Sequence, residues 1–188
     1  TWTATRFNCS GVINESIYLS STQFQNLRSI LFVSMDRKKL EGGDNLQFNR
    51  FLNYIKNYQF RIGSHLWAKI DNSLSNEALS YTQTLISANR FGTKIGNSLG
   101  VNTFNRNKNV LMFSFNRSAD HHSGEDTRQG RIVNLQLEMR ETAGRELVIG
   151  DNSYTLEARL DPKDAVVLLW SKHSKMVNIS SRGISVTQ

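Results

Sequence analysis

The residue types best able to bind a metal gather in one polar stretch, Ser118–Gly130, which reads SADHHSGEDTRQG. Adjacent histidines such as His121 and His122 point apart on an extended backbone, and zinc sites usually space their ligands more widely. Glu125 and Asp126 carry carboxylates that suit a hard cation, so they are the weak candidates for an ion between subunits. The composition otherwise predicts an exposed loop, and no metal centre is predicted.

Nucleophilic chemistry has no recognisable motif in this chain. The sequence contains no G-x-S-x-G, no Walker phosphate loop and no H-E-x-x-H. Its single cysteine, Cys9, excludes an internal disulfide framework and is expected to be a small buried hydrophobe. We therefore predict neither an enzyme nor a bound cofactor.

The charge of the chain points to a polyanionic partner. Lysine and arginine number 23 against 16 acids, which gives a formal charge of +7 and a pI near 9.8. The cations are scattered, which favours sequence-independent phosphate contacts over base reading. Trp67 is expected to pack beneath a loop or subunit, with base stacking as the alternative. The predicted nucleic-acid-binding residues are Arg6, Arg37, Lys38, Lys39, Arg50, Lys56, Arg61 and Lys69.

The stretch Asn45–Asp71 organises the elements that would position these side chains. A helix over about 45–57 is predicted from an apolar stripe with helical spacing. From Phe60 the pattern changes to period two and predicts one long strand, with Arg61 and Lys69 on its polar side. The apolar stripe of the helix consists of Phe48, Phe51, Leu52 and Ile55. The expected buried face of the strand consists of Phe60, Ile62, Leu66 and Ile70.

The remaining segments predict a sheet protein with long connecting loops. Val133–Met139 alternates cleanly, and the apolar runs Leu27–Met35 and Ala165–Trp170 predict buried strands. Ala78–Arg90 is interpreted as a strand in preference to a helix. Further predictions are a hairpin from Glu146–Ile149 and Tyr154–Leu160, closing strands at Met176–Ile179 and Ile184–Val186, and a surface connection at Phe91–Lys108. The result is an all-β sandwich or barrel, with one domain over residues 1–188.

The segment Tyr54–Ile62, YIKNYQFRI, carries a resemblance to a known family. A helix followed by an aromatic-Arg-Ile strand is similar to the coats of satellite viruses and circular single-stranded DNA viruses. The resemblance implies an eight-stranded jelly-roll β-sandwich that self-assembles into a small icosahedral shell. It also implies that basic residues neutralise packaged viral RNA or single-stranded DNA, that a basic arm precedes Thr1, and that the protein occurs in the virion and, during assembly, in the host cell.

Two other classes of protein remain open. The first is a secreted or cellular β-sandwich that binds protein or glycan, and the second is an enzyme on a β-barrel. Occupied glycosylation sites and monomeric behaviour would favour the first alternative, whereas a particle of many subunits would favour a coat. No run of about 18 apolar residues exists, so no membrane partner is predicted. The glycosylation triplets begin at Asn8, Asn14, Asn116 and Asn178.

Overall fold

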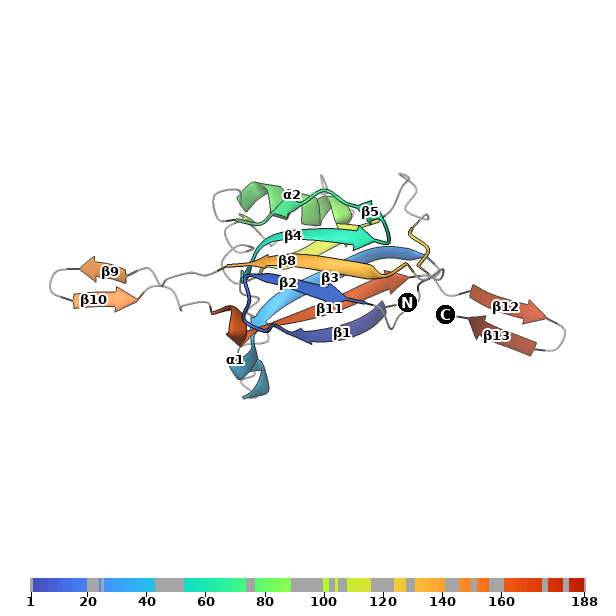
Figure 1. The fold of residues 1–188 in the computed structure, drawn as a ribbon, viewed down its shortest axis with the longest axis horizontal. Helices are drawn as coiled ribbons and strands as arrows, with labels where there is room; N and C mark the ends of the chain where they lie inside the picture. Colours follow the sequence, from blue (N-terminus) through green and yellow to red (C-terminus); the bar gives the residue numbers. More distant parts are fainter. Residues whose placement is uncertain are drawn as a thin grey trace.

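The computed structural model describes residues 2–19, 24, 26–42, 53–73, 77–88, 100–101, 104, 108–115, 124–127, 131–140, 146–149, 152–155, 161–173, 176–180 and 183–187. Within these ranges two antiparallel sheets face each other (Figure 1). No helix in this part of the chain has the length and apolar character needed to cross a membrane.

The first sheet contains the most apolar strands of the sequence. Its order is β1 (Trp2–Asn8), β11 (Ala165–His173), β3 (Leu27–Asp36) and β7 (Val110–Ser114). The two apolar runs predicted as buried strands are β3 and β11, and they pair with each other at the centre of the sheet. The prediction of two buried strands is therefore confirmed.

The second sheet alternates between apolar and polar side chains. Its order is β2 (Asn14–Tyr18), β8 (Val133–Met139), β4 (Ile55–Ile62) and β5 (His65–Leu66), and β6 (Ile70–Asp71) also pairs with β4. The predicted alternation of β8 is confirmed, because its apolar positions are all buried. These positions are Val133, Leu135, Leu137 and Met139.

The strand pairing is nested along the chain. β1 pairs with β11, β2 with β8, β3 with β7, and β4 with β5. Two further pairings, β11 with β3 and β8 with β4, join these pairs into the two sheets. Nested antiparallel pairing of eight strands in two sheets is the arrangement of a jelly roll, so the predicted fold class is confirmed.

Aromatic rings fill the space between the sheets. Phe60 of β4 lies at the centre, with ring centroids 5.0 Å from Phe113, 5.2 Å from Phe115 and 6.0 Å from Phe32. Most of these pairs are edge-on, the geometry that the ring quadrupoles favour. This cluster fixes how the two sheets pack.

The predicted long strand through residues 60–71 is wrong, because β4 ends in a tight hairpin. Gly63 has a φ of +58°, a conformation that suits glycine, and the chain reverses into β5. Leu66 therefore lies opposite the exposed Arg61 and is itself 54% exposed. Phe60 and Ile62 are buried as predicted, and Ile70 is partly buried.

The last part of the predicted helix is wrong. Residues 53 and 54 are not helical and Ile55 begins β4, while residues 45–52 lie outside the described residues. Within the described residues, helices occur at α1 (Arg37–Glu41) and at α2 (Glu77–Ser87), where a strand was preferred. A 3₁₀ turn, η3 (Pro162–Asp164), precedes β11.

The buried side of α2 explains the wrong assignment. Ser80 and Thr84, one helical turn apart, are buried, while Leu79 and Ile86 are exposed. Because two buried positions carry hydroxyl side chains, next to the packed ring of Tyr81, the sequence lacks the continuous apolar stripe that predicts a helix.

Two hairpins stand apart from the sandwich, at opposite ends of it (Figure 1). The predicted hairpin near Glu146 is confirmed with β9 (Glu146–Ile149) as its first strand, but its second strand, β10 (Asn152–Thr155), begins two residues before the predicted Tyr154–Leu160, of which residues 156–160 lie outside the described residues. The expectation that the last strands close the sheet is wrong, since β12 (Met176–Ser180) and β13 (Gly183–Thr187) pair with each other. Pairing within a short hairpin satisfies their backbone groups locally.

Candidate nucleic-acid interface

The outer face of the second sheet carries polar side chains in register. Directly opposed residues of antiparallel strands share a face, and the intervening residues point into the core. We call the resulting set of residues the polar face. Its rows across β2, β8 and β4 are Asn14–Glu138–Asn57, Ser16–Gln136–Gln59 and Tyr18–Asn134–Arg61.

A β-bulge in β4 gathers charge at one end of the polar face. Ile55 pairs with Met139 and Asn57 with Glu138, so Lys56 is the extra residue. A bulge sets two residues against one, and here both side chains reach the same carboxylate. The Nζ of Lys56 and the Nδ2 of Asn57 each lie 2.7 Å from a Glu138 carboxylate oxygen.

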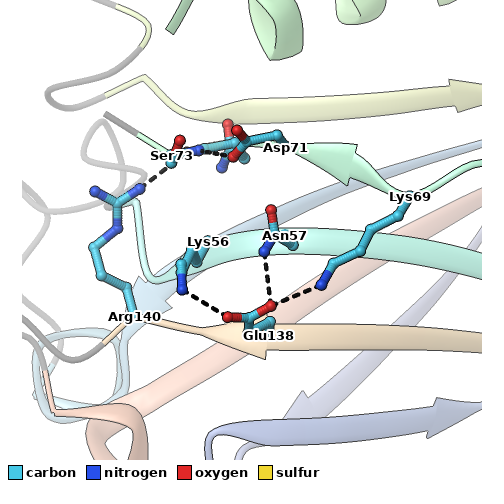
Figure 2. Close-up of polar contacts among 8 residues, drawn as sticks. Lys56, Asn57, Lys69, Asp71, Ser73, Glu138 and Arg140 are labelled. Atoms are coloured by element: carbon cyan, nitrogen blue, oxygen red, sulfur yellow. Dashed lines mark hydrogen bonds and ion pairs between the residues drawn. The ribbon is translucent and has the colours of Figure 1, made fainter. Parts of the chain in front are cut away.

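Lys69 completes this arrangement from the segment before β6. Its Nζ lies 2.8 Å from Oε2 of Glu138, so two ammonium groups converge on one carboxylate (Figure 2). Hydrogen bonds from Lys56, then from Lys69 and Asn57, lower the pKa of Glu138 from 4.5 to about 2. The cluster keeps one net positive charge at neutral pH.

Replacing Glu138 by glutamine should lower the free energy of unfolding by about 1 kcal/mol at neutral pH, because exposed ion pairs contribute little more. The contribution of Glu138 to the free energy of unfolding is fully present above pH 4.5, the ordinary pKa of its carboxyl group. It is lost as the pH falls toward 2, because the unfolded chain takes up its proton first. Denaturant titrations of wild type and Glu138→Gln near pH 7 and near pH 2 should therefore converge at the lower pH. An equal difference at both would contradict this assignment.

A shallow hollow of about 290 Å³ lies on the polar face. Side chains of Asn14, Ser16, Gln59 and Gln136 line it together with the charged cluster at Glu138. Amides and hydroxyls offer both donors and acceptors, so this surface suits a hydrogen-bonding ligand rather than an apolar one.

The predicted basic residues fall into two groups. Lys56, Arg61 and Lys69 flank the polar face, and Arg61 donates from Nε to the carbonyl of Gly63 at 3.1 Å. None of the described carboxylates pairs with the Arg61 guanidinium. This group is the one that the structure brings together on a single surface.

The second group lies around α1. Arg6 pairs with Glu41, and Lys38 Nζ lies 3.4 Å from Asp164, while Arg37 is half-buried. Exposed ion pairs of this kind are weak, so both cations stay available to a phosphate. Arg50 and the side chain of Lys39 lie outside the described residues.

The outer face of the first sheet carries an apolar cluster beside Arg6 and Asn8. Val33, Met35 and Val166 are buried there, and partly buried apolar side chains surround them. A sheet with one free face normally alternates apolar and polar residues, as the second sheet does. The first sheet instead carries a second apolar cluster, whose centre is already buried within this chain. Its partly buried members are Leu31, Leu40, Val110, Leu168 and Trp170.

The weak metal candidates Glu125 and Asp126 lie in a segment packed against the fold, and His121 and His122 lie outside the described residues. Glu125 is buried and its backbone pairs with Leu27, so this part of the predicted exposed loop is packed against the fold. Asp126 is half-buried, and no group of three potential metal ligands occurs within the described ranges. The weak prediction of an ion at this pair receives no support from the described geometry.

Cys9 is buried, as predicted. Burial, followed by the charge of Glu15, raises the pKa of its thiol to about 12, although Arg37 acts in the opposite direction. The thiolate required of a nucleophile is therefore scarce at neutral pH.

Two aromatic residues bear on the interface: Trp67 packs, as its preferred interpretation expected, and Tyr18 was not predicted. Trp67 packs inside the subunit, with ring centroids 5.6 Å from both Phe113 and Phe115, so it is not free to stack on a base. Tyr18, which was not predicted, is the exposed aromatic residue of the polar face. The alternation of Glu15, Ile17 and Leu19 with the residues between them could have placed it outward.

The chain matches no family model and no curated protein. Among solved structures it is similar to a chain of the PBCV-1 virus capsid, described as a quasi-atomic model, with a TM-score of 0.57 and 10% sequence identity. The match covers 100% of this chain and 49% of that one, so this chain spans about half the length of the capsid chain. The fold therefore resembles that of a viral capsid protein. The finer resemblance to satellite-virus and circular DNA-virus coats stays a prediction.

Proposed function

We propose that this chain is the shell-forming part of a viral capsid protein, with residues 1–188 as a single shell domain that associates with further copies of itself. The capsid-like fold carries this proposal, and the partly buried apolar side chains on the outer face of the first sheet support it. Leu31, Val110, Leu168 and Trp170 are only partly buried there, so part of their apolar area is free to contact another molecule. The capsid-like fold favours another copy of the chain as its partner.

Helix α2 adds a second surface of the same kind. Leu79 and Ile86 are 44% and 50% exposed, and their spacing places them on one side of the helix. A helix that buries hydroxyls and exposes apolar side chains fits a subunit whose surface is covered on assembly.

The proposal includes packaging of nucleic acid through basic residues, without sequence preference. The formal charge of +7 and the cations beside the polar face support this role. The shell subunit would then act in the virion and, during assembly, in the host cell.

Replacing Leu168 by lysine tests the first sheet as a contact between copies. Leu168 lies between Arg6 and Val33 on the apolar outer face. A lysine there places an unpaired charge in the contact, so we expect the association constant to fall by at least about 30-fold, equivalent to about 2 kcal/mol. Light scattering across a dilution series measures this change, and circular dichroism checks the fold.

Ser16→Lys provides the matched control, because it adds the same charge to the polar face of the other sheet. Association by this variant should equal that of the wild type. If both lysine variants weaken association equally, net charge rather than the apolar face is responsible, and the assigned contact is wrong.

A further inference from the structure

One row of the polar face combines an aromatic ring, an amide and a cation. Tyr18, Asn134 and Arg61 are opposed across β2, β8 and β4, so their side chains share the outer face. Tyr18 is 61% exposed, and Arg61 is also exposed. Leu66, opposed to Arg61 on β5, adds an exposed apolar side chain at the end of the row.

Asn134 in the middle of this row has an unmet hydrogen-bonding need. Its side chain is only 8% exposed, and its Oδ1 has no hydrogen-bond partner in the part of the chain that the structure describes. A buried amide oxygen without a donor costs free energy, and such groups call for an explanation. A ligand that brings an N–H donor to this row would satisfy the Asn134 oxygen.

These groups match the chemistry of single-stranded nucleic acid. Bases stack on exposed aromatic rings whatever their sequence, and arginine binds the phosphates between them. The Watson–Crick edge of an unpaired base carries N–H donors, and the Asn134 oxygen accepts from no donor among the described residues. A duplex hides those edges and faces, so it would not use the tyrosine.

We propose that the Tyr18–Asn134–Arg61 row is a subsite for single-stranded nucleic acid, in which one base stacks on Tyr18 beside a phosphate held by Arg61. The strand would continue along the polar face past the amides of Gln136 and Gln59 toward Lys69. This subsite rests on the proposed packaging function and specifies where that function acts and on which form of nucleic acid.

Fluorescence anisotropy with labelled oligo(dT), titrated across salt concentration, tests the subsite. Tyr18→Ala should weaken binding by about 5- to 150-fold, the usual loss for one stacked base, while Tyr18→Phe keeps the affinity. Arg61→Gln should reduce the slope of log K against log salt by about 0.7, the value for one phosphate of a single strand. Tyr18→Ala should leave that slope unchanged.

Trp2→Ala is the matched control. Trp2 is also an exposed aromatic, with the Lys172 ammonium 5.8 Å from its ring, but it lies on β1 of the other sheet. Its removal should leave the affinity unchanged. A loss at Trp2 instead of Tyr18 would overturn the subsite and leave the packaging role intact.

Three further results would overturn the proposal. Wild-type affinity of Tyr18→Ala would refute the subsite alone. Preference for duplex over oligo(dT) would refute the stacked base. If the wild type does not bind oligo(dT) at low salt, both the subsite and the packaging role are refuted. This holds whether or not the protein binds a neutral polysaccharide such as dextran.

Discussion

Replacing Ile62 by aspartate is expected to lower the free energy of unfolding by about 4 kcal/mol, because a carboxylate in a packed core has no partner. Ile62 is buried at the end of β4, between the two sheets. Denaturant titration followed by far-UV circular dichroism measures the loss, and an unfolded variant is the extreme form of the same result.

Leu66→Asp is the control for this prediction. Leu66 shares the β4–β5 hairpin but is exposed, so its replacement should change the free energy of unfolding by less than about 0.5 kcal/mol. Equal losses in the two variants would mean that the hairpin at Gly63 is wrong and that both side chains belong to one buried strand face.

Replacing Asn72 by alanine should lower the free energy of unfolding by about 3 kcal/mol. The buried Nδ2 of Asn72 lies 2.8 Å from the Ile55 carbonyl, 2.9 Å from Asn53 Oδ1 and 3.2 Å from Asn109 Oδ1. Truncation leaves these acceptors buried without a donor, and each such group costs about 1–3 kcal/mol.

The Arg140 contact is a useful reference for this variant. Its guanidinium donates to the backbone carbonyl of Asn72 at 2.9 Å, a bond that alanine keeps. Asn14→Ala, which removes an exposed amide from the second sheet, should cost less than about 0.5 kcal/mol. A similarly small loss at Asn72 would show that water replaces the missing donor.

The strands were predictable where burial leaves a simple pattern. Val133–Met139 buries one face, so its period of two appears directly in the sequence. β3 and β11 bury side chains on both of their faces, so they appear in the sequence as continuous apolar runs. The helix α2 was not predictable from apolar spacing, since Ser80 and Thr84 form its buried side. The hairpin at Gly63 depends on a positive φ at that glycine. The apolar and polar residues alternate on both sides of it, so the pattern predicted one continuous strand.

The candidate interface was predictable only in part. Composition identified Lys56, Arg61 and Lys69 as cations, but it did not show that Glu138 neutralises part of their charge. That contact depends on a β-bulge, which shifts the register by one residue and has no composition signal here. The proposed role of Tyr18 depends on its alignment with Asn134 and Arg61 across three strands. These residues are far apart in the sequence, so the alignment could not be predicted from it.

Sedimentation velocity of the wild-type chain tests the central claim, that this capsid-like sandwich assembles with copies of itself. The measurement is made at neutral pH and moderate salt over a wide range of protein concentration. We predict species larger than the monomer whose share grows with concentration, because association removes from water the apolar area that the partly buried residues of the outer face still expose. A single species with the mass of one chain, 21.4 kDa, at every concentration would contradict the claim.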